Sequence, residues 1–416
     1  MYIKKIMLKD IRCFKNVGMS YDLSGDIPPW TVIVGDNSAG KTTLLRSIAI
    51  GLCDESSAAG LLKESDSGYV RYAEPEGKII IDLSEDNKNY SIETTIKHIK
   101  TKNGYIERVR QKTKPSTFPW DNLFVAGYGA GRGTSGTGDI AGYSVINAVY
   151  NMFNYTEGLQ NPELTILRLE KKALQREARK ILANLLTVNS IKWGKSGITV
   201  DGKWGKNMPL RDLADGYKST FLWITDLLGW AVSFYPRLQK SSSIKGVVLV
   251  DEIEQHLHPK WQKDIIGQLK IQFPKIQFIT TTHSPLVASS FGALTQKDID
   301  KRILLSLSPN EGVLKEELPP MIGWRVDRIL ASKAFEYQIT GESDEVDKLL
   351  YDASMLAGKT KRTKEDNEKY RKIKQKIALA RLSERQTKTE DEIDQQVAEY
   401  LIGQIKQKKK SIFGKD

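Results

Sequence analysis

A glycine-rich loop between an apolar strand and a helix constrains this chain more than any other segment. Residues 31–34 are Thr-Val-Ile-Val, which predicts a buried strand, and apolar side chains recur at helical spacing over residues 43–52. The segment between them reads GDNSAGKT. A loop of this composition in this setting is typical of proteins that bind the phosphates of a nucleoside triphosphate.

The residue types in the loop support phosphate binding position by position. Gly35 and Gly40 let the backbone curl so that successive amides point inward, and the helix N-terminus adds the positive end of its dipole. Lys41 is expected to reach the β- and γ-phosphates, and the Thr42 hydroxyl to bind Mg²⁺. The residues expected to hold the nucleotide are Gly35, Asn37, Ser38, Ala39, Gly40, Lys41, Thr42 and Thr43.

The composition is that of a globular protein with a basic excess. The 416 residues suffice for two or three domains, and the formal net charge is +12. This charge indicates an anionic partner, most commonly a nucleic acid, or serves solubility alone. Two cysteines are too few for a disulfide framework, and no apolar run approaches the ~18 residues that span a bilayer. We therefore expect a cytoplasmic protein that does not enter a membrane.

Two later strand ends carry groups that nucleotide hydrolysis needs. Residues 247–250 predict a buried strand that ends in Asp251 and Glu252. Opposite a phosphate loop, Asp251 would hold Mg²⁺ and Glu252 would orient or deprotonate the attacking water. A further strand at 276–280 is followed by His283, which is placed to hydrogen-bond the γ-phosphate.

Two other glycine-containing segments are candidates for the same site. Residues 210–219, LRDLADGYKS, precede an apolar helix, and Gly216 at its start offers backbone amides to an anion. Taken alone, this pattern is only a helix cap. The segment YGAGRGTSGTG follows a strand predicted at 120–126. It is interpreted either as a flexible connector or as a nucleotide-sensing loop with Tyr128 and Arg132 near the phosphates.

Together these motifs resemble those of ABC-type ATPase heads, and in particular the branch that includes RecF, SMC and OLD-type ATPases. LADGYKS stands where transporters have LSGGQ, and DEIEQHLHP and THSPL are typical wordings of this branch. The motifs occur in the expected order and approximate spacing, at residues 35–42, 213–219, 247–252, 256–259 and 282–285.

The resemblance implies an α/β fold. Its mixed or parallel sheet would be flanked by helices and accompanied by an antiparallel β subdomain and a helical lobe. The ATPase head would cover residues 1–310, with the β-rich insert at about 65–115 and the helical lobe at about 140–235. A mainly helical, basic region would follow at 311–416.

The resemblance also implies two ATP molecules held between two copies of the chain. One copy would supply its phosphate loop and three further side chains, Asp251, Glu252 and His283. The other would supply the start of the signature helix, Ala214, Asp215 and Gly216. Catalysis would rest on Glu252, His283 and Lys41, with Thr42 and Asp251 as the Mg²⁺ ligands. The usual Q-loop glutamine has no counterpart, and the loop at Tyr128–Arg132 is a candidate replacement.

Local patterns predict several further elements. Asn161-Pro162 is typical of a helix start, and the apolar stripe that follows predicts one amphipathic helix that ends near Thr187. Residues 188–206 resemble a β-hairpin with Asp201-Gly202 in its turn. Strands are expected at 78–83 and 89–95, separated by a polar turn.

The region beyond the head has weaker signals. Residues 319–330, with Phe335, resemble the segment that follows the head in the PtuA ATPases of Septu antiphage systems, which also occur beside some retrons. Residues 357–416 carry more than half of the net charge and predict two amphipathic helices, either a solvated hairpin or an arm that binds DNA or a partner. No acidic metal-binding pattern and no Cys/His nuclease signature occurs at 310–416, so we expect no nuclease domain here.

Three functions fit this reading to different degrees. We expect first an ATPase that dimerises around ATP and regulates a separate HNH-type nuclease in antiphage defence. The alternative is a RecF-like repair or recombination ATPase that binds DNA or another nucleic acid, for which the basic charge is the argument. A transporter subunit is disfavoured because LADGYKS departs from the transporter wording.

Overall fold

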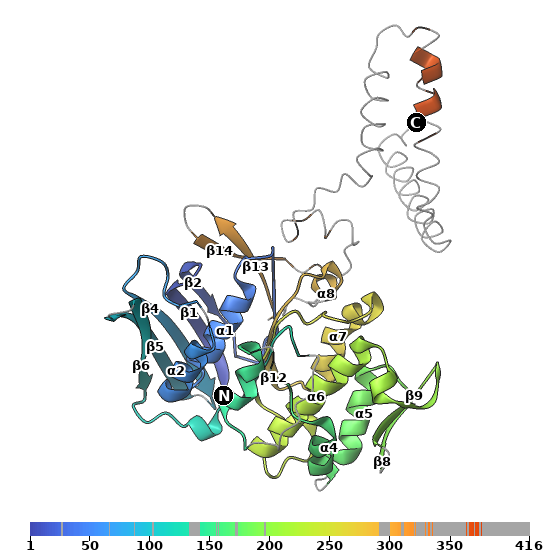
Figure 1. Cartoon of the computed structure of the whole chain (residues 1–416), viewed down its shortest axis with the longest axis horizontal. Coiled ribbons are helices and arrows are strands. Elements are labelled where there is room, and N and C mark those ends of the chain that lie inside the picture. The colour runs from blue at the N-terminus through green and yellow to red at the C-terminus, as the bar shows by residue number, and fades with distance from the viewer. Residues whose placement is uncertain are drawn as a thin grey trace, which may run out of the picture. The chain divides into compact units, whose positions relative to one another are not determined.

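The computed structural model describes most of residues 1–321 and scattered residues beyond them (Figure 1). Its gaps up to that point are residues 26–27, 66, 87, 102–103, 133–141, 155, 157, 171–173, 195–196, 291–299, 309–311 and 320. The described residues after 321 are 329, 332, 335, 363, 366–369, 371–373 and 376. The chain divides into two compact units, residues 1–337 and 338–416. The predictions for 322–328 and for the last 40 residues lie outside the described part.

A six-stranded mixed sheet forms the centre of the first unit, in the order β14-β13-β3-β12-β11-β7. The strands are β3 (Thr31–Gly35), β7 (Val125–Tyr128), β11 (Gly246–Val250), β12 (Ile276–Thr281), β13 (Lys301–Ser308) and β14 (Gly312–Glu317). β14 pairs antiparallel with β13 and the other neighbours are parallel. Every residue of β3, β7, β11 and β12 is buried, as in parallel sheets covered on both faces. The strands predicted from the loop and acidic motifs are thus confirmed.

A five-stranded antiparallel sheet in the order β2-β1-β4-β5-β6 covers one side of the central sheet (Figure 1). Its strands are β1 (Tyr2–Ile11), β2 (Phe14–Ser20), β4 (Glu76–Glu85), β5 (Lys88–Thr101) and β6 (Gly104–Lys114). Between the sheets lie α1 (Lys41–Gly51) and α2 (Glu55–Lys63). A Cβ at Gly51 would lie 2.7 Å from side-chain atoms of Ile79 and Ile81, so α1 packs directly onto β4. The strands predicted at 78–83 and 89–95 are confirmed as parts of β4 and β5.

Helices and a small sheet pack on the opposite face of the central sheet (Figure 1). The described helices there are α4 (Pro162–Glu170), α5 (Gln175–Leu185), α6 (Asp215–Phe234), α7 (Pro259–Gln272) and α8 (Pro285–Ser289). The short helix α3 (Val145–Val149) packs mainly in the core shared with α1 and α2. Single 3₁₀ turns are η1 (Trp120–Asn122), η2 (Tyr150–Met152), η3 (Leu210–Asp212) and η4 (Ser241–Ser243). The small sheet comprises β8 (Ser190–Gly194), β9 (Gly197–Gly202) and β10 (Gly205–Pro209). Among the described helices, none combines the length and the apolar character that crossing a bilayer requires.

The single helix predicted from Asn161 to Thr187 is wrong, because the structure has two helices there, α4 and α5. Its predicted start is confirmed, since the Asn161 side chain accepts a hydrogen bond from the backbone amide of Glu163 at 2.9 Å. Both helices bury apolar side chains in the same core, including Ile166 of α4 and Ile181 of α5. Apolar periodicity therefore continues across the break and does not reveal it.

The hairpin predicted at 188–206 is instead a three-stranded antiparallel sheet. β9 and β10 do form a hairpin, but Asp201 and Gly202 are the last residues of β9 and the turn is Lys203-Trp204, directly after them. The Asp201 carboxylate accepts hydrogen bonds from the Asn207 backbone amide at 2.7 Å and the Ser190 hydroxyl at 2.8 Å, on the two neighbouring strands. The Asp-Gly pattern thus marks a cross-strand anchor at the centre of the sheet.

Candidate functional site

The glycine-rich loop joins β3 to α1, as the sequence predicts. Gly40 precedes α1 with φ 85°, and a Cβ there would lie 2.6 Å from the Cys13 sulfur. Gly35 has φ 152°, and a Cβ there would lie 2.4 Å from the Leu305 carbonyl oxygen. Glycine is therefore required at both positions, by backbone conformation and by close packing.

Lys41 is held inside the loop that it follows. Its ammonium group donates to the carbonyl oxygens of Gly35 at 2.6 Å and Asp36 at 2.8 Å. The side chain is buried, and this desolvation lowers the pKa of Lys41, opposed by the nearby charges of Asp251 and Glu252. The loop thus presents a cation and the N-terminal amides of α1 to the same space, which suits a phosphate group.

The acidic pair lies at the carboxyl end of β11, across from the start of α1. The Thr42 hydroxyl donates to Asp251 Oδ2 at 2.7 Å, and the Thr281 hydroxyl donates to Asp251 Oδ1 at 2.5 Å. A hydroxyl and a carboxylate oxygen in contact are hard ligands of the kind that Mg²⁺ prefers. Thr42 and Asp251 therefore fit the Mg²⁺ role predicted for them, with Thr281 orienting the carboxylate.

One pocket of about 370 Å³ brings most of the predicted groups together. Its lining comprises Asn37, Ser38, Gly40, Lys41, Thr42, Thr43, Asp251, Glu252, His283, Arg12 and Cys13. Gly35 and Ala39 shape the loop without lining the pocket, since Ala39 is buried and the Gly35 carbonyl binds Lys41. Arg12 and Cys13 were missed by the sequence analysis, because the tight turn between β1 and β2 carries no phosphate-binding pattern.

His283 enters this pocket from the segment that follows β12. Its side chain is exposed, and its backbone amide donates to Glu254 Oε1 at 2.5 Å. Glu254 lies just beyond the acidic pair, so this bond ties the His283 segment to the end of β11. The imidazole is consequently free to face a phosphate while its backbone is anchored.

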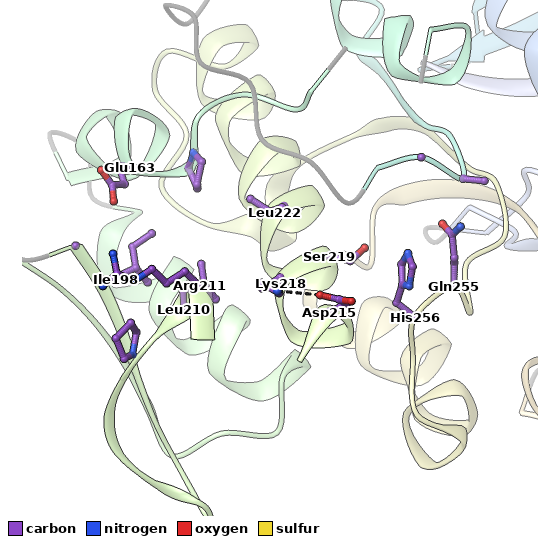
Figure 2. Close-up of a pocket in the computed structure, with 15 residues that line it drawn as sticks. Glu163, Ile198, Leu210, Arg211, Asp215, Lys218, Ser219, Leu222, Gln255 and His256 are labelled. Atoms are coloured by element: carbon purple, nitrogen blue, oxygen red, sulfur yellow. Dashed lines mark ion pairs between the residues drawn. The ribbon is translucent and has the colours of Figure 1, made fainter. Parts of the chain in front are cut away.

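The predicted signature residues Ala214, Asp215 and Gly216 lie outside this pocket. They cap and begin α6, and Asp215 lines a second pocket of about 840 Å³ together with Lys218, Ser219, Gln255 and His256, among others. Figure 2 shows this pocket, with the ion pair between Asp215 and Lys218 at 2.8 Å. A Cβ at Gly216 would lie 2.3 Å from the His256 carbonyl oxygen. The start of α6 therefore abuts the segment that follows Glu252, while Ala214 and Asp215 remain exposed.

Neither Tyr128 nor Arg132 lines the 370 Å³ pocket. Tyr128 is fully buried, and its hydroxyl donates to the Asp226 carboxylate on α6 at 3.0 Å. Arg132 is 1% exposed, and its guanidinium donates to the backbone carbonyl oxygens of Asp251 at 2.6 Å and Glu252 at 2.8 Å. The Arg132 side chain therefore holds the backbone of the acidic segment, whereas the Tyr128 side chain links β7 to α6. The loop that follows Arg132 lies outside the described residues.

Two family models match the chain. Residues 5–124 match a model described as an AAA domain. Residues 144–289 match a model described as an AAA domain, putative AbiEii toxin, Type IV TA system. The two matches together include the phosphate-binding loop, the acidic pair and His283.

Similar proteins extend this picture. The chain is 27% identical over 339 residues to the Septu protein PtuA of Bacillus mycoides, covering 80% of this chain and 45% of that protein. It is 33% identical over 130 residues to the Retron Vc95 probable ATPase of Vibrio cholerae, covering 31% and 25%. The solved SMC head domain from Thermotoga maritima is similar with a TM-score of 0.45 and 13% identity, over 77% of this chain and 100% of that one. The chain spans less than half the length of these two curated relatives.

Proposed function

We propose that this chain, as an ABC-type ATPase of the RecF/SMC-like branch, binds and hydrolyses ATP in the 370 Å³ pocket. The observation that carries the proposal is the convergence of Lys41, Thr42, Asp251, Glu252 and His283 on one cavity from separate segments of the chain. These groups are a cation, a metal-ligand pair, a carboxylate and an imidazole, which suit phosphoryl transfer to water.

Each group has a separate task in this mechanism. The loop amides and Lys41 bind the β- and γ-phosphates, and Thr42 with Asp251 would hold Mg²⁺. When bound there, the ion would neutralise the charge that develops on the phosphate oxygens. Glu252 orients the attacking water and accepts its proton, and His283 hydrogen-bonds the γ-phosphate from the neighbouring strand.

Replacement of the proposed base tests this assignment. Glu252→Gln keeps the size of the side chain but removes the proton acceptor, so ATP turnover should fall by about 10²-fold or more. Binding of a fluorescent ATP analogue should remain, because Lys41 and the loop are unchanged. Hydrolysis by the variant at the wild-type rate would contradict the role of Glu252.

We propose further that two copies close around ATP, with the start of α6 of each facing the nucleotide of the other. The exposure of Ala214 and Asp215 and their position outside the lining of their own nucleotide pocket support this arrangement. In the Glu252→Gln background with ATP and Mg²⁺, we expect a dimer by light scattering. Ala214→Arg should prevent it, whereas Gly267→Arg, on the exposed surface of α7 with open space around it, should not. A monomer under all conditions would contradict the proposal.

The role in antiphage defence is proposed from the relatives. Septu PtuA and the retron ATPase support a chain that regulates a separate effector, for which we propose an HNH-type nuclease, with no nuclease domain in residues 310–416. Affinity purification of the tagged protein from its native host, followed by mass spectrometry, tests this. A nuclease in stoichiometric amount is expected. Repair proteins and nucleic acid without a nuclease would favour the RecF-like alternative.

The antiparallel sheet provides one observation in favour of that alternative. Arg108, Lys112 and Lys114 alternate along β6 with the buried Val109 and therefore share its exposed face. Lys97 lies opposite Arg108 in the neighbouring strand. Although Glu76 pairs with Lys97 and Glu93 lies opposite Lys112, cations are in excess on this face, which suits the phosphate backbone of a duplex.

Salt dependence distinguishes binding at this face from weak general attraction. If duplex DNA binds here, a double variant Arg108→Glu and Lys112→Glu should weaken binding and reduce the slope of log K against log salt by about 0.9 for each phosphate that is no longer neutralised. The double reversal Lys260→Glu and Lys263→Glu, at exposed positions of α7, is the matched control and should leave the slope unchanged. An equal effect of both variants would argue against the β6 face.

A further inference from the structure

Glu252 has an unusual backbone conformation. Its φ is 48°, in the left-handed region that residues with a side chain seldom adopt. The side chain emerges from β11 at this point, so the conformation decides where the carboxylate is directed. Such a conformation persists only where the surrounding structure holds it.

Hydrogen bonds hold Glu252 at both of its backbone groups. Its amide donates to the Thr281 hydroxyl at 2.8 Å, and its carbonyl oxygen accepts from the Arg132 guanidinium at 2.8 Å. The same guanidinium donates to the carbonyl oxygens of Asp251 at 2.6 Å and Gly129 at 3.2 Å. Arg132 therefore links the loop after β7 to the two residues that carry the carboxylates.

The burial of Arg132 makes these bonds strong. Only 1% of the residue is exposed, and burial lowers its pKa to about 10 while the charges of Glu254, Asp251 and Glu252 oppose that shift. The guanidinium is thus charged near neutral pH. A planar fork can serve two successive carbonyl groups at once, which a single ammonium point charge does less well.

We propose that Arg132 is a positioning residue of the ATPase site: its guanidinium, bound to the carbonyl groups of Asp251 and Glu252, keeps Glu252 in the left-handed conformation that aims its carboxylate at the attacking water. This inference rests on the proposed hydrolysis of ATP. In this role Arg132 contacts neither the nucleotide nor the attacking water, and it acts through the backbone of Glu252. It lies 120 residues away from Glu252 in the chain.

The segment that carries Arg132 also borders the second pocket. Ala130 and Gly131 line the 840 Å³ pocket together with Asp215 and Lys218 from the start of α6. A displacement of this segment at the α6 side would move the guanidinium away from the Glu252 carbonyl group, which would then keep only the hydrogen bond from the Gln255 amide at 2.9 Å. Arg132 therefore couples the surroundings of the signature residues to the direction of the catalytic carboxylate.

The test is a double-mutant cycle of Arg132→Lys and Glu252→Gln, measured as ATP turnover and as affinity for a fluorescent ATP analogue. Arg132→Lys should lower kcat about tenfold or more, because misdirection of a reacting group by about 1 Å can cost 10²-fold. Affinity for the analogue should stay within about twofold. In the Glu252→Gln background, Arg132→Lys should cause no further loss, because its effect passes through that carboxylate.

Arg179→Lys is the matched control. Arg179 is half-buried on α5, its guanidinium carbon lies 4.3 Å from the centre of the Trp193 ring, and it lines neither pocket. Arg179→Lys should leave kcat unchanged even where it lowers the melting temperature as much as Arg132→Lys does. If Arg132→Lys does not fold, Arg132→Gln, whose amide can donate to one carbonyl without a buried charge, is measured in the same way.

The outcomes separate the inference from its premise. A wild-type kcat in Arg132→Lys, or an equal fold-loss in the wild-type and Glu252→Gln backgrounds, would overturn the positioning role. Absence of ATP turnover in the wild-type protein would instead overturn the proposed function. A loss of kcat confined to the background that retains Glu252, with unchanged nucleotide affinity, would establish the inference.

Discussion

A buried carboxylate on α6 should make the stability of this protein depend on pH in a predictable direction. Asp226 is 2% exposed, and it accepts hydrogen bonds from the Tyr128 hydroxyl at 3.0 Å and the backbone amide of Gln160 at 2.9 Å. Burial raises its pKa from 3.8 to about 6, although hydrogen bonds from Gln160, Tyr128 and Trp230 oppose the shift. The group links the signature helix to the end of β7.

The direction follows from linkage. Because the pKa in the folded state is above that in the unfolded state, the protonated acid contributes stability that is fully present below pH 3.8 and is lost as the pH rises through about 6. The difference of about 2.2 between the two pKa values corresponds to about 3 kcal/mol in total. Between pH 5 and pH 8 the same two values give a loss of about 1 kcal/mol.

Asp226→Asn removes this titration while it preserves the shape of the side chain. The amide oxygen can accept from Gln160, and the amide nitrogen can donate to the Tyr128 oxygen. The rearranged hydrogen bonds should lower the free energy of unfolding of Asp226→Asn by about 1 kcal/mol at every pH. The stability of the variant relative to wild type should therefore improve by about 1 kcal/mol from pH 5 to pH 8.

Urea denaturation at pH 5, 6.5 and 8, followed by tryptophan fluorescence, measures this difference. Asp212→Asn, at an exposed carboxylate, is the control and should not reproduce the difference expected for Asp226→Asn. A difference between Asp226→Asn and wild type that stays constant with pH, or that moves in the opposite direction, would refute the reasoning.

Further predictions concern the nucleotide pocket. Lys41→Ala should weaken the binding of a fluorescent ATP analogue itself, because it removes the cation held by the loop; unchanged affinity would contradict the role of Lys41. Thr281→Val should lower the free energy of unfolding by about 1–3 kcal/mol, since it leaves the Glu252 amide without its acceptor, and denaturation curves measure this loss. The same variant should weaken the Mg²⁺ dependence of turnover through Asp251, which a Mg²⁺ titration checks.

Much of the candidate site follows from short segments of sequence. The phosphate loop, the acidic pair and His283 each come directly after a buried strand, and the strands are neighbours in one sheet. Because the carboxyl ends of parallel strands meet at one edge, motifs that follow them converge without further information. The strands predicted at 31–34, 247–250 and 276–280 and the placement of Lys41, Asp251, Glu252 and His283 are accordingly those of the structure. The strand predicted at 120–126 is wrong, because residues 120–122 form a 3₁₀ turn and β7 begins only at Val125.

The elements that were predicted wrongly show the limit of periodicity. Apolar spacing continues from α4 into α5, since both pack on one core, so the sequence indicated one helix. An Asp-Gly pair indicated a hairpin turn, whereas Asp201 binds across three strands. In both cases a local pattern was compatible with two structures, and packing between elements selected one.

The sequence by itself determined the α/β fold and the groups that form the nucleotide pocket. Each strand, and each motif that follows a strand, is encoded by residues close together in the chain. Only the tertiary structure decided how the site is braced. Arg132 reaches the Glu252 carbonyl group across 120 residues, Tyr128 reaches Asp226 across 98, and Thr281 reaches Asp251 across 30. No periodicity or motif spacing encodes these hydrogen bonds, since each depends on the path of the backbone between segments that meet only in the folded protein.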